Sequence, residues 1–139
     1  MPGNESTAGS FIADMARETH AYRLLIVEDE ELIARNMKEL LEEEGYCVVG
    51  IAKTAEDALA LSEAHVPTAA LVDVRLAEAI DGITLAQELT RLYGVRIVFV
   101  TGNPLAVWRR TEGTAQAILS KPYSDQELLS AVETACMSE

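Results

Sequence analysis

Hydrophobic residues fall along this chain in short uninterrupted runs, separated by longer stretches in which they alternate with polar residues. Runs of roughly four to eight aliphatic residues, bounded by turn-forming residues, are typical of strands that are buried on both faces of a parallel sheet. Such runs cover 23–29, 46–52, 69–73, 96–101 and 117–120. The run 69–73 is the most informative, because it is wholly aliphatic until it ends in the carboxylate of Asp73.

The stretches between these runs carry apolar residues at helical spacing, which predicts helices with one buried face. Helices are expected over 30–44, from Thr54 onward, over 83–93 and from Ser124 onward. Gly45 and Gly94 are positioned to end two of them, and a capping box over 124–127 starts the last. The pattern is weak only after Asn103-Pro104, where 105–110 leaves room for fewer than two helical turns.

Strands that alternate with helices predict right-handed crossovers and a parallel sheet that helices cover on both faces. We therefore predict a doubly wound α/β fold of the flavodoxin-like type, with five strands in the order 2-1-3-4-5. In this order Glu28 and Asp29 converge with Asp73 at the carboxyl edge of the sheet, where such folds hold ligands. The segment 74–82 is expected to be a loop, with Asp81-Gly82 as its turn.

The composition narrows the classes of function. At 139 residues, of which 49% are hydrophobic and only 5% aromatic, the chain predicts one domain with an aliphatic core. There are 23 acidic residues against 11 basic ones, for a formal net charge of -12. Because a nucleic-acid surface needs clustered lysine and arginine, and Arg109-Arg110 is the one basic doublet, we expect no nucleic-acid partner. No apolar run is long enough to span a membrane, so no membrane partner is expected.

Residues 1–21 are predicted to form an N-terminal tail, with neither the basic start nor the apolar stretch of a secretory signal. Within it, Phe11, Ile12 and Met15 fall at helical spacing. Two interpretations stay open, a frayed tail or a short helix that docks on the domain or on a partner. Cys47 and Cys136 form no C-x-x-C motif, so reduced thiols and a cytoplasmic location are expected.

Five polar side chains at strand ends favour a site for a divalent cation and a phosphoryl group, namely Glu28, Asp29, Asp73, Thr101 and Lys121. Crowded carboxylates repel one another unless a cation neutralises them, and a few oxygen ligands with remaining waters suit Mg²⁺ better than Ca²⁺. Asp73 is the candidate nucleophile, while Lys121 and Thr101 face the phosphoryl oxygens. Each residue alone has a simpler interpretation, since an acidic pair after a strand often complements a helix dipole and a lysine is usually solvated. Their combination favours the site.

The motifs LLIVEDE, LVDVRL, VFVTG and LSKPY together resemble the receiver domain of two-component response regulators, which assigns 22–139 to a CheY-like receiver domain. The resemblance implies that Asp73 is the phospho-acceptor and that Thr101 and Lys121 contact the phosphoryl oxygens. It implies that Mg²⁺ is held by Glu28, Asp29, Asp73 and the backbone carbonyl of Arg75. It further implies a cis peptide bond between Lys121 and Pro122.

The chain departs from the usual receiver pattern in two places. Receivers usually carry tyrosine or phenylalanine three residues before the lysine, a position that is Ile118 here, which places the usual threonine–aromatic switch in doubt. The interval from Thr101 to Lys121 is also short, which predicts a shortened or remodelled fourth helix. With VFVTGNP, this spacing resembles receivers of the alphaproteobacterial general stress response, of the PhyR and FATGUY types. Arg75 and Asn103 flank the site at positions where receivers tune dephosphorylation.

The resemblance implies a stand-alone response regulator that catalyses only its own phosphorylation and dephosphorylation and is not otherwise an enzyme. It would accept phosphate from a sensor histidine kinase and signal by contact with a downstream signalling protein. In that pathway it would act as a modulator or a phosphate sink. A homodimer stays open as an additional assembly. The segment 104–116 is the candidate switch, and Trp108 within it is expected to pack rather than to anchor a partner. One alternative is a binding or dimerisation module that is never phosphorylated. Another, an aspartyl-phosphate phosphatase, fits less well because Arg75 stands where such enzymes carry a second acid.

Overall fold

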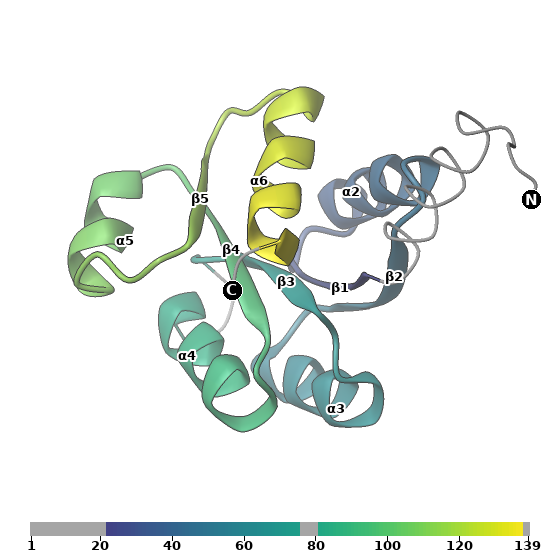
Figure 1. The fold of residues 1–139 in the computed structure, drawn as a ribbon, viewed down its shortest axis with the longest axis horizontal. Helices are drawn as coiled ribbons and strands as arrows, with labels where there is room; N and C mark the ends of the chain where they lie inside the picture. The colour runs from purple at the N-terminus through teal and green to yellow at the C-terminus, as the bar shows by residue number, and fades with distance from the viewer. Residues whose placement is uncertain (1–21, 76–80, 138–139) are drawn as a thin grey trace, which may run out of the picture.

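The computed structural model describes residues 22–75 and 81–137 of the chain. Five strands form a single parallel sheet in the order β2-β1-β3-β4-β5, and in Figure 1 this order runs from right to left. The strands are β1 Arg23–Val27, β2 Cys47–Ala52, β3 Ala69–Asp73, β4 Arg96–Thr101 and β5 Ala117–Ser120. The predicted flavodoxin-like topology is therefore confirmed, and three of the five strands begin and end where the sequence placed them.

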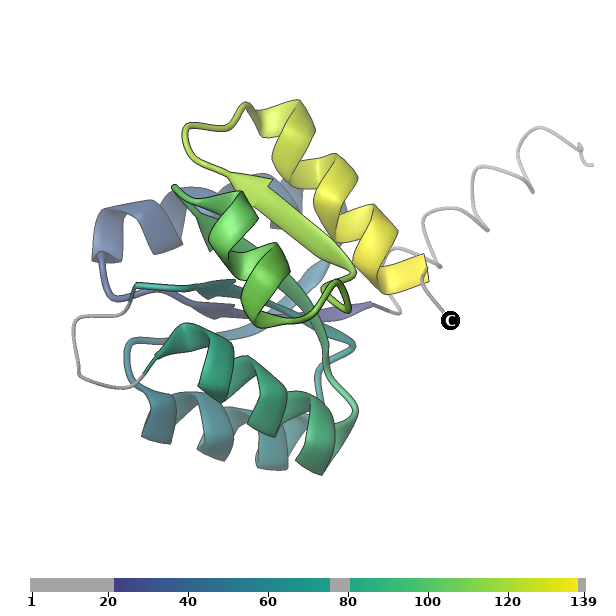
Figure 2. The same cartoon turned by 90° about the vertical axis from the view of Figure 1, so that its left-hand side faces the viewer.

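Helices cover both faces of this sheet. They are α2 Glu31–Glu43, α3 Ala55–His65, α4 Gly82–Tyr93, α5 Pro104–Arg110 and α6 Asp125–Met137. Figure 2 shows α2 and α6 on one face, α3 and α4 on the other, and the short α5 beside β5. None of these helices is long and apolar enough to cross a membrane.

The central strand β3 is buried over all five of its residues. Its side chains alternate between the two faces: Leu71 packs in the cluster beneath α2 and α6, while Ala70 and Val72 pack in the cluster beneath α3 and α4. Each cluster is aliphatic apart from Phe99 and a few partly buried tyrosines, as the composition predicted. Asp73 is thus fixed at the end of a strand that has no freedom to shift register.

Local signals in the sequence set most of the helix ends. The hydroxyl of Thr54 accepts a hydrogen bond from the backbone N–H of Asp57 at 3.1 Å, and this contact caps α3. Gly94 ends α4 with a positive φ of 69°, a conformation that glycine adopts without strain. Ser124 and Glu127 form the predicted capping box, with reciprocal hydrogen bonds of 2.9 and 3.1 Å ahead of α6.

Two expectations need correction. Asp81-Gly82 is not a turn inside a loop, because Asp81 caps α4 and Gly82 is its first residue. The segment 104–116 agrees with its prediction, since seven of its residues form α5, which confirms the shortened helix. Trp108 does not fill a core gap, because 50% of it is exposed. The predictions for 1–21 lie outside the described residues.

Candidate functional site

The carboxyl ends of β1, β3 and β4 bring the predicted acids together. Val27 pairs with Val72 and Asp73 pairs with Val100, so the three strands end at one edge of the sheet. Asp73 closes β3 and is 5% exposed, while Glu28 directly follows β1 and is 1% exposed. Each of Glu28, Asp29 and Asp73 places a carboxylate oxygen within 4.8 Å of the others. The sequence prediction that these three acids converge is met by the geometry.

The buried carboxylate of Glu28 is only partly satisfied by hydrogen bonds. Its Oε2 accepts a hydrogen bond from the backbone N–H of Glu30 at 3.0 Å. Its Oε1 is buried and has no hydrogen-bond partner among the described residues. Burial, together with the nearby charge of Asp73 and against the opposing effect of the Glu30 N–H, raises the pKa of Glu28 to about 7. A buried oxygen without a partner is costly and indicates a ligand-binding role for this carboxylate.

Asp73 is held in place through both of its carboxylate oxygens. Oδ1 accepts a hydrogen bond from the backbone N–H of Arg75 at 2.9 Å, and Oδ2 lies 3.3 Å from Nζ of Lys121. The side chain of Asp73 is 7% exposed and that of Lys121 is 39% exposed, so the lysine reaches from solvent into the site. The lysine therefore contacts Asp73 rather than lying free in solvent.

Thr101 and the loop after β5 complete the edge. Thr101 is the buried last residue of β4, and its carbonyl accepts a 2.8 Å hydrogen bond from the backbone N–H of Lys121. Its hydroxyl oxygen accepts from the N–H of Asn103 at 2.9 Å, while its hydroxyl hydrogen has no acceptor among the described residues. Thr101 can therefore donate that hydrogen to an oxygen entering the site. The peptide bond between Lys121 and Pro122 is cis, as the resemblance implied.

Two residues at the site were not given a role by the sequence. Gly82 packs so closely on Asp73 that a Cβ there would lie 2.4 Å from the carbonyl oxygen of Asp73. The signal in the sequence is the Asp-Gly pair, which by itself indicates only a turn. Tyr123 is half-buried, and burial together with the charges of Glu28 and Asp73 raises the pKa of its phenol. Its position two residues after Lys121 could have indicated that it lies near the acids.

The residues present fit a hard divalent cation. Three carboxylates face one ammonium group, and the unpartnered Oε1 of Glu28 is an available oxygen ligand. Such an oxygen-rich set with few protein ligands suits Mg²⁺. Glu28, Asp29 and Asp73 would hold the ion, while the carbonyl of Arg75 as a further ligand stays a prediction.

Comparison with known proteins agrees with this geometry. Residues 24–133 match the family described as the response regulator receiver domain. The transcriptional regulatory protein PdtaR of Mycobacterium tuberculosis is 36% identical over 115 residues, which cover 81% of this chain and 56% of PdtaR. The phyllosphere-induced regulator PhyR of Methylorubrum extorquens is 30% identical over 124 residues, which cover 88% of this chain and 45% of PhyR. This chain thus spans about half the length of these curated relatives.

A solved structure shares the fold. The crystal structure of the response regulator PhyR from Brucella abortus superposes with a TM-score of 0.72 at 30% identity, over 91% of this chain and 52% of that one. Members of this family are phospho-acceptor domains in two-component signalling, where they interact with histidine kinases and downstream partners. With its family match and an acidic edge of the expected composition, the chain belongs to the response regulator receiver domain family.

Proposed function

We propose that this protein accepts a phosphoryl group on Asp73 from a sensor histidine kinase and passes the signal to a downstream protein by direct contact. The observation that carries the proposal is the environment of Asp73. Its carboxylate is oriented by the N–H of Arg75, faces the ammonium of Lys121 and lies beside two further acids. Few residues other than a nucleophile need such a combination of fixed orientation and nearby cation.

The transfer is a single displacement at phosphorus. A carboxylate oxygen of Asp73 attacks the phosphorus of a phosphohistidine, an O–P bond forms as the N–P bond breaks, and the imidazole leaves with the electron pair. Lys121 and the free hydroxyl hydrogen of Thr101 stabilise charge on the phosphoryl oxygens. Later attack by water on phosphorus breaks the new O–P bond and restores Asp73. The protein thus promotes only its own phosphorylation and dephosphorylation.

Glu28, Asp29 and Asp73 would hold Mg²⁺, which would supply the positive charge that a phosphoryl group needs to approach three carboxylates. Phosphorylation adds about -1.5 to -2 charges at neutral pH. Lys121 alone cannot balance this charge together with those of the acids. We therefore expect phosphoryl transfer to require the cation.

The pathway that we propose is a general stress response, in which the protein acts as modulator or phosphate sink. Two observations support it: the identity of 30% to the phyllosphere-induced regulator PhyR and the short α5. The stand-alone arrangement remains a prediction from the sequence, since the matched relatives are about twice as long.

Incubation with acetyl phosphate and Mg²⁺, followed by intact mass measurement, tests the acceptor. We expect one added phosphoryl group in the wild type, none in Asp73→Asn, and none in the wild type with EDTA. Asp57→Asn, which changes an exposed aspartate of α3, serves as the matched control and should be phosphorylated like the wild type. A phosphoryl group that is still added to Asp73→Asn would refute the assignment.

A second candidate function is a receiver-like binding or dimerisation module that is never phosphorylated. It is favoured by Ile118, a partly buried aliphatic residue at the position where receivers usually carry an aromatic ring. The same experiment separates the two functions. Failure of the wild type to bind Mg²⁺ and to gain mass would favour the binding module.

A further inference from the structure

Helix α5 is held to the domain by very little packing. Of its seven residues only Val107 is buried, in the cluster on the α3 and α4 side of the sheet. Leu105 and Trp108 are 54% and 50% exposed. Because one buried side chain fixes a helix poorly, the polar contacts at its two ends have a large share in setting its position.

The contact at the start of α5 leads to the phosphorylation site. The side chain of Asn103 caps the helix, with Oδ1 accepting from the N–H of Ala106 at 3.2 Å. The N–H of the same asparagine donates to the hydroxyl oxygen of Thr101 at 2.9 Å. The hydroxyl that is placed to meet a phosphoryl oxygen therefore also positions the residue that caps α5.

The contact at the end of α5 connects this helix to the same site through the backbone that follows β3. The guanidinium of Arg110 pairs with the carboxylate of Asp81, which also caps α4 by accepting from the N–H of Ile83 at 2.9 Å. Partial burial by itself would raise the pKa of Asp81, but the hydrogen bonds from Arg110 and Ile83 lower it overall, so this carboxylate stays ionised. The next residue, Gly82, packs against the carbonyl of Asp73.

The two contacts, one at each end of α5, therefore tie it to different strands. The Thr101 contact fixes its start to β4, and the Arg110 contact fixes its end to the backbone that follows β3. A phosphoryl group on Asp73 would offer the hydroxyl of Thr101 an acceptor and would add charge at the end of β3. Both contacts of α5 would then change together, and a short helix held at its two ends would reorient.

We propose that Arg110 is the positioning residue through which the state of Asp73 sets the orientation of α5 and thereby the presentation of Leu105 and Trp108. The inference rests on the proposed phosphorylation. It also accounts for Ile118, which has no ring or hydroxyl with which to follow Thr101. The coupling passes through the Asp81–Arg110 ion pair instead.

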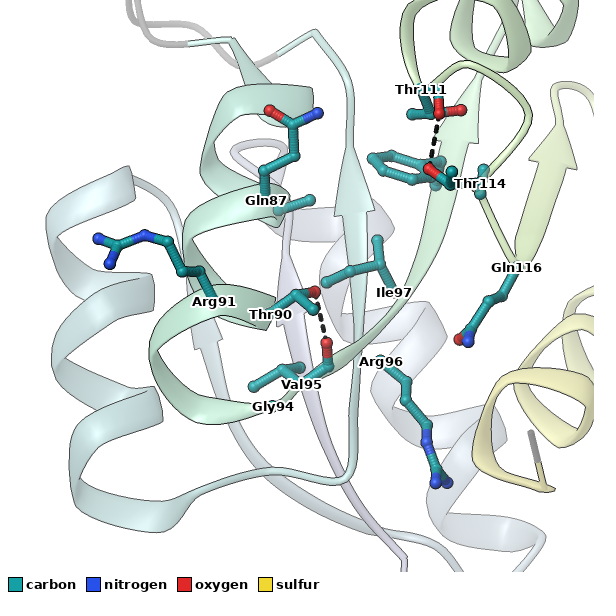
Figure 3. Close-up of a pocket in the computed structure, with 13 residues that line it drawn as sticks. Gln87, Thr90, Arg91, Gly94, Val95, Arg96, Ile97, Thr111, Thr114 and Gln116 are labelled. Atoms are coloured by element: carbon teal, nitrogen blue, oxygen red, sulfur yellow. Dashed lines mark hydrogen bonds between the residues drawn. The ribbon is translucent and has the colours of Figure 1, made fainter. Parts of the chain in front are cut away.

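The surroundings of α5 leave space for this movement. A pocket of about 380 Å³ lies between α4, β4 and the segment that follows α5, and Figure 3 shows Gln87, Thr90, Ile97, Thr111 and Thr114 around it. Thr111 and Thr114 belong to that segment, where the Thr114 hydroxyl donates to the carbonyl of Thr111 at 2.6 Å. The end of α5 therefore borders open volume rather than a packed neighbour.

Trp108 provides the measurement, since it is the one tryptophan of the chain. Its ring lies against Gly113, where a Cβ would come within 3.1 Å of a ring carbon, so its emission and its quenching by acrylamide report the orientation of α5. We expect acetyl phosphate with Mg²⁺ to change both signals in the wild type. Because the coupling passes through this ion pair, we expect Arg110→Gln to reduce the amplitude by about half or more, while the modest strength of a partly exposed pair leaves some response.

Matched variants separate coupling from general damage. Arg109→Gln removes the neighbouring exposed arginine, which makes no ion pair with the described residues, and should keep the full response. Asp81→Asn keeps an oxygen for the α4 cap and should reduce the response as Arg110→Gln does, with no further loss in the double variant. Phosphoryl incorporation, measured by mass, should remain at the wild-type level in all of them.

The outcomes are distinguishable. A full Trp108 response in phosphorylated Arg110→Gln, or an equal loss in Arg109→Gln, overturns the role of Arg110 and leaves the proposed function intact. A response that falls only because phosphate is no longer incorporated also overturns it. A wild type that gains no phosphate refutes the proposed function, and the inference falls with it.

Discussion

Replacing Glu28 by glutamine is expected to stabilise the protein at neutral pH when no divalent cation is present. The carboxylate of Glu28 is 1% exposed, and its Oε1 has no hydrogen-bond partner among the described residues. Ionisation at this position therefore places a charge that the hydrogen bond from the Glu30 N–H to Oε2 compensates only in part. Glutamine has nearly the same shape but carries no charge at any pH.

The pKa gives the size and the sign of the effect. Burial, with the nearby charge of Asp73, raises the pKa of Glu28 from 4.5 to about 7. The folded state thus binds this proton more tightly than the unfolded state, so the stability it contributes is fully present below pH 4.5 and is lost as pH rises through 7. At about 1.4 kcal/mol per pKa unit, the loss amounts to at most about 3 kcal/mol.

Urea unfolding in EDTA at about pH 5 and about pH 8 measures the effect, because these values bracket most of the titration. Between about pH 5 and about pH 8, the unfolding free energy of the wild type should fall by up to about 3 kcal/mol relative to that of Glu28→Gln. Glu30→Gln serves as the control, since Glu30 is exposed and its side chain makes no capping hydrogen bond. It should follow the wild type at both pH values.

Two results would refute this reasoning. One is a difference between wild type and Glu28→Gln that does not change with pH, and the other is a difference that moves in favour of the wild type as pH rises. Adding Mg²⁺ gives an independent check, because the ion stabilises only the folded protein that binds it. The wild type should recover its stability at about pH 8, and Glu28→Gln should gain much less.

Two further substitutions test how the site is supported. Gly82→Ala should cost about 1–3 kcal/mol in urea unfolding, because its Cβ would lie 2.4 Å from the Asp73 carbonyl oxygen. Gly102→Ala is the control, since a Cβ there meets nothing within 4 Å, and equal losses in both would contradict the explanation. Ser124→Ala should cost about 1 kcal/mol by removing the cap of α6, and unchanged unfolding would show that the capping box contributes nothing.

The strands could be predicted from the sequence because each boundary depends on neighbouring residues. The run 69–73 is wholly apolar before it ends in a carboxylate, and the observed β3 has the same limits. Thr54 and Ser124 lie within three residues of the N–H groups that they cap, so their roles are also visible locally. The meeting of Glu28 with Asp73 then follows from the strand order alone.

The features that escaped prediction are contacts between residues far apart in the sequence. Arg110 and Asp81 are joined across two helices, and no local pattern pairs one of several arginines with one of many acids. The closeness of Gly82 to the Asp73 carbonyl depends on how the chain returns from β3 to α4. The exposure of Trp108 depends on where a two-turn helix comes to rest. Each is decided by tertiary packing, which periodicity does not report.

The charges at the sheet edge explain why the same acids can destabilise the metal-free protein and also provide a cation-binding site. When Glu28 is ionised, the three carboxylates and the ammonium of Lys121 leave a net negative charge at this edge of the sheet. A Mg²⁺ ion bound there would cancel that charge, so the repulsion that weakens the metal-free protein would become part of the free energy of cation binding. The proposed phosphoryl group would then restore negative charge beside the neutralised acids. Replacing Glu28 by glutamine should therefore weaken Mg²⁺ binding while strengthening the metal-free fold, because one carboxylate is the source of both effects.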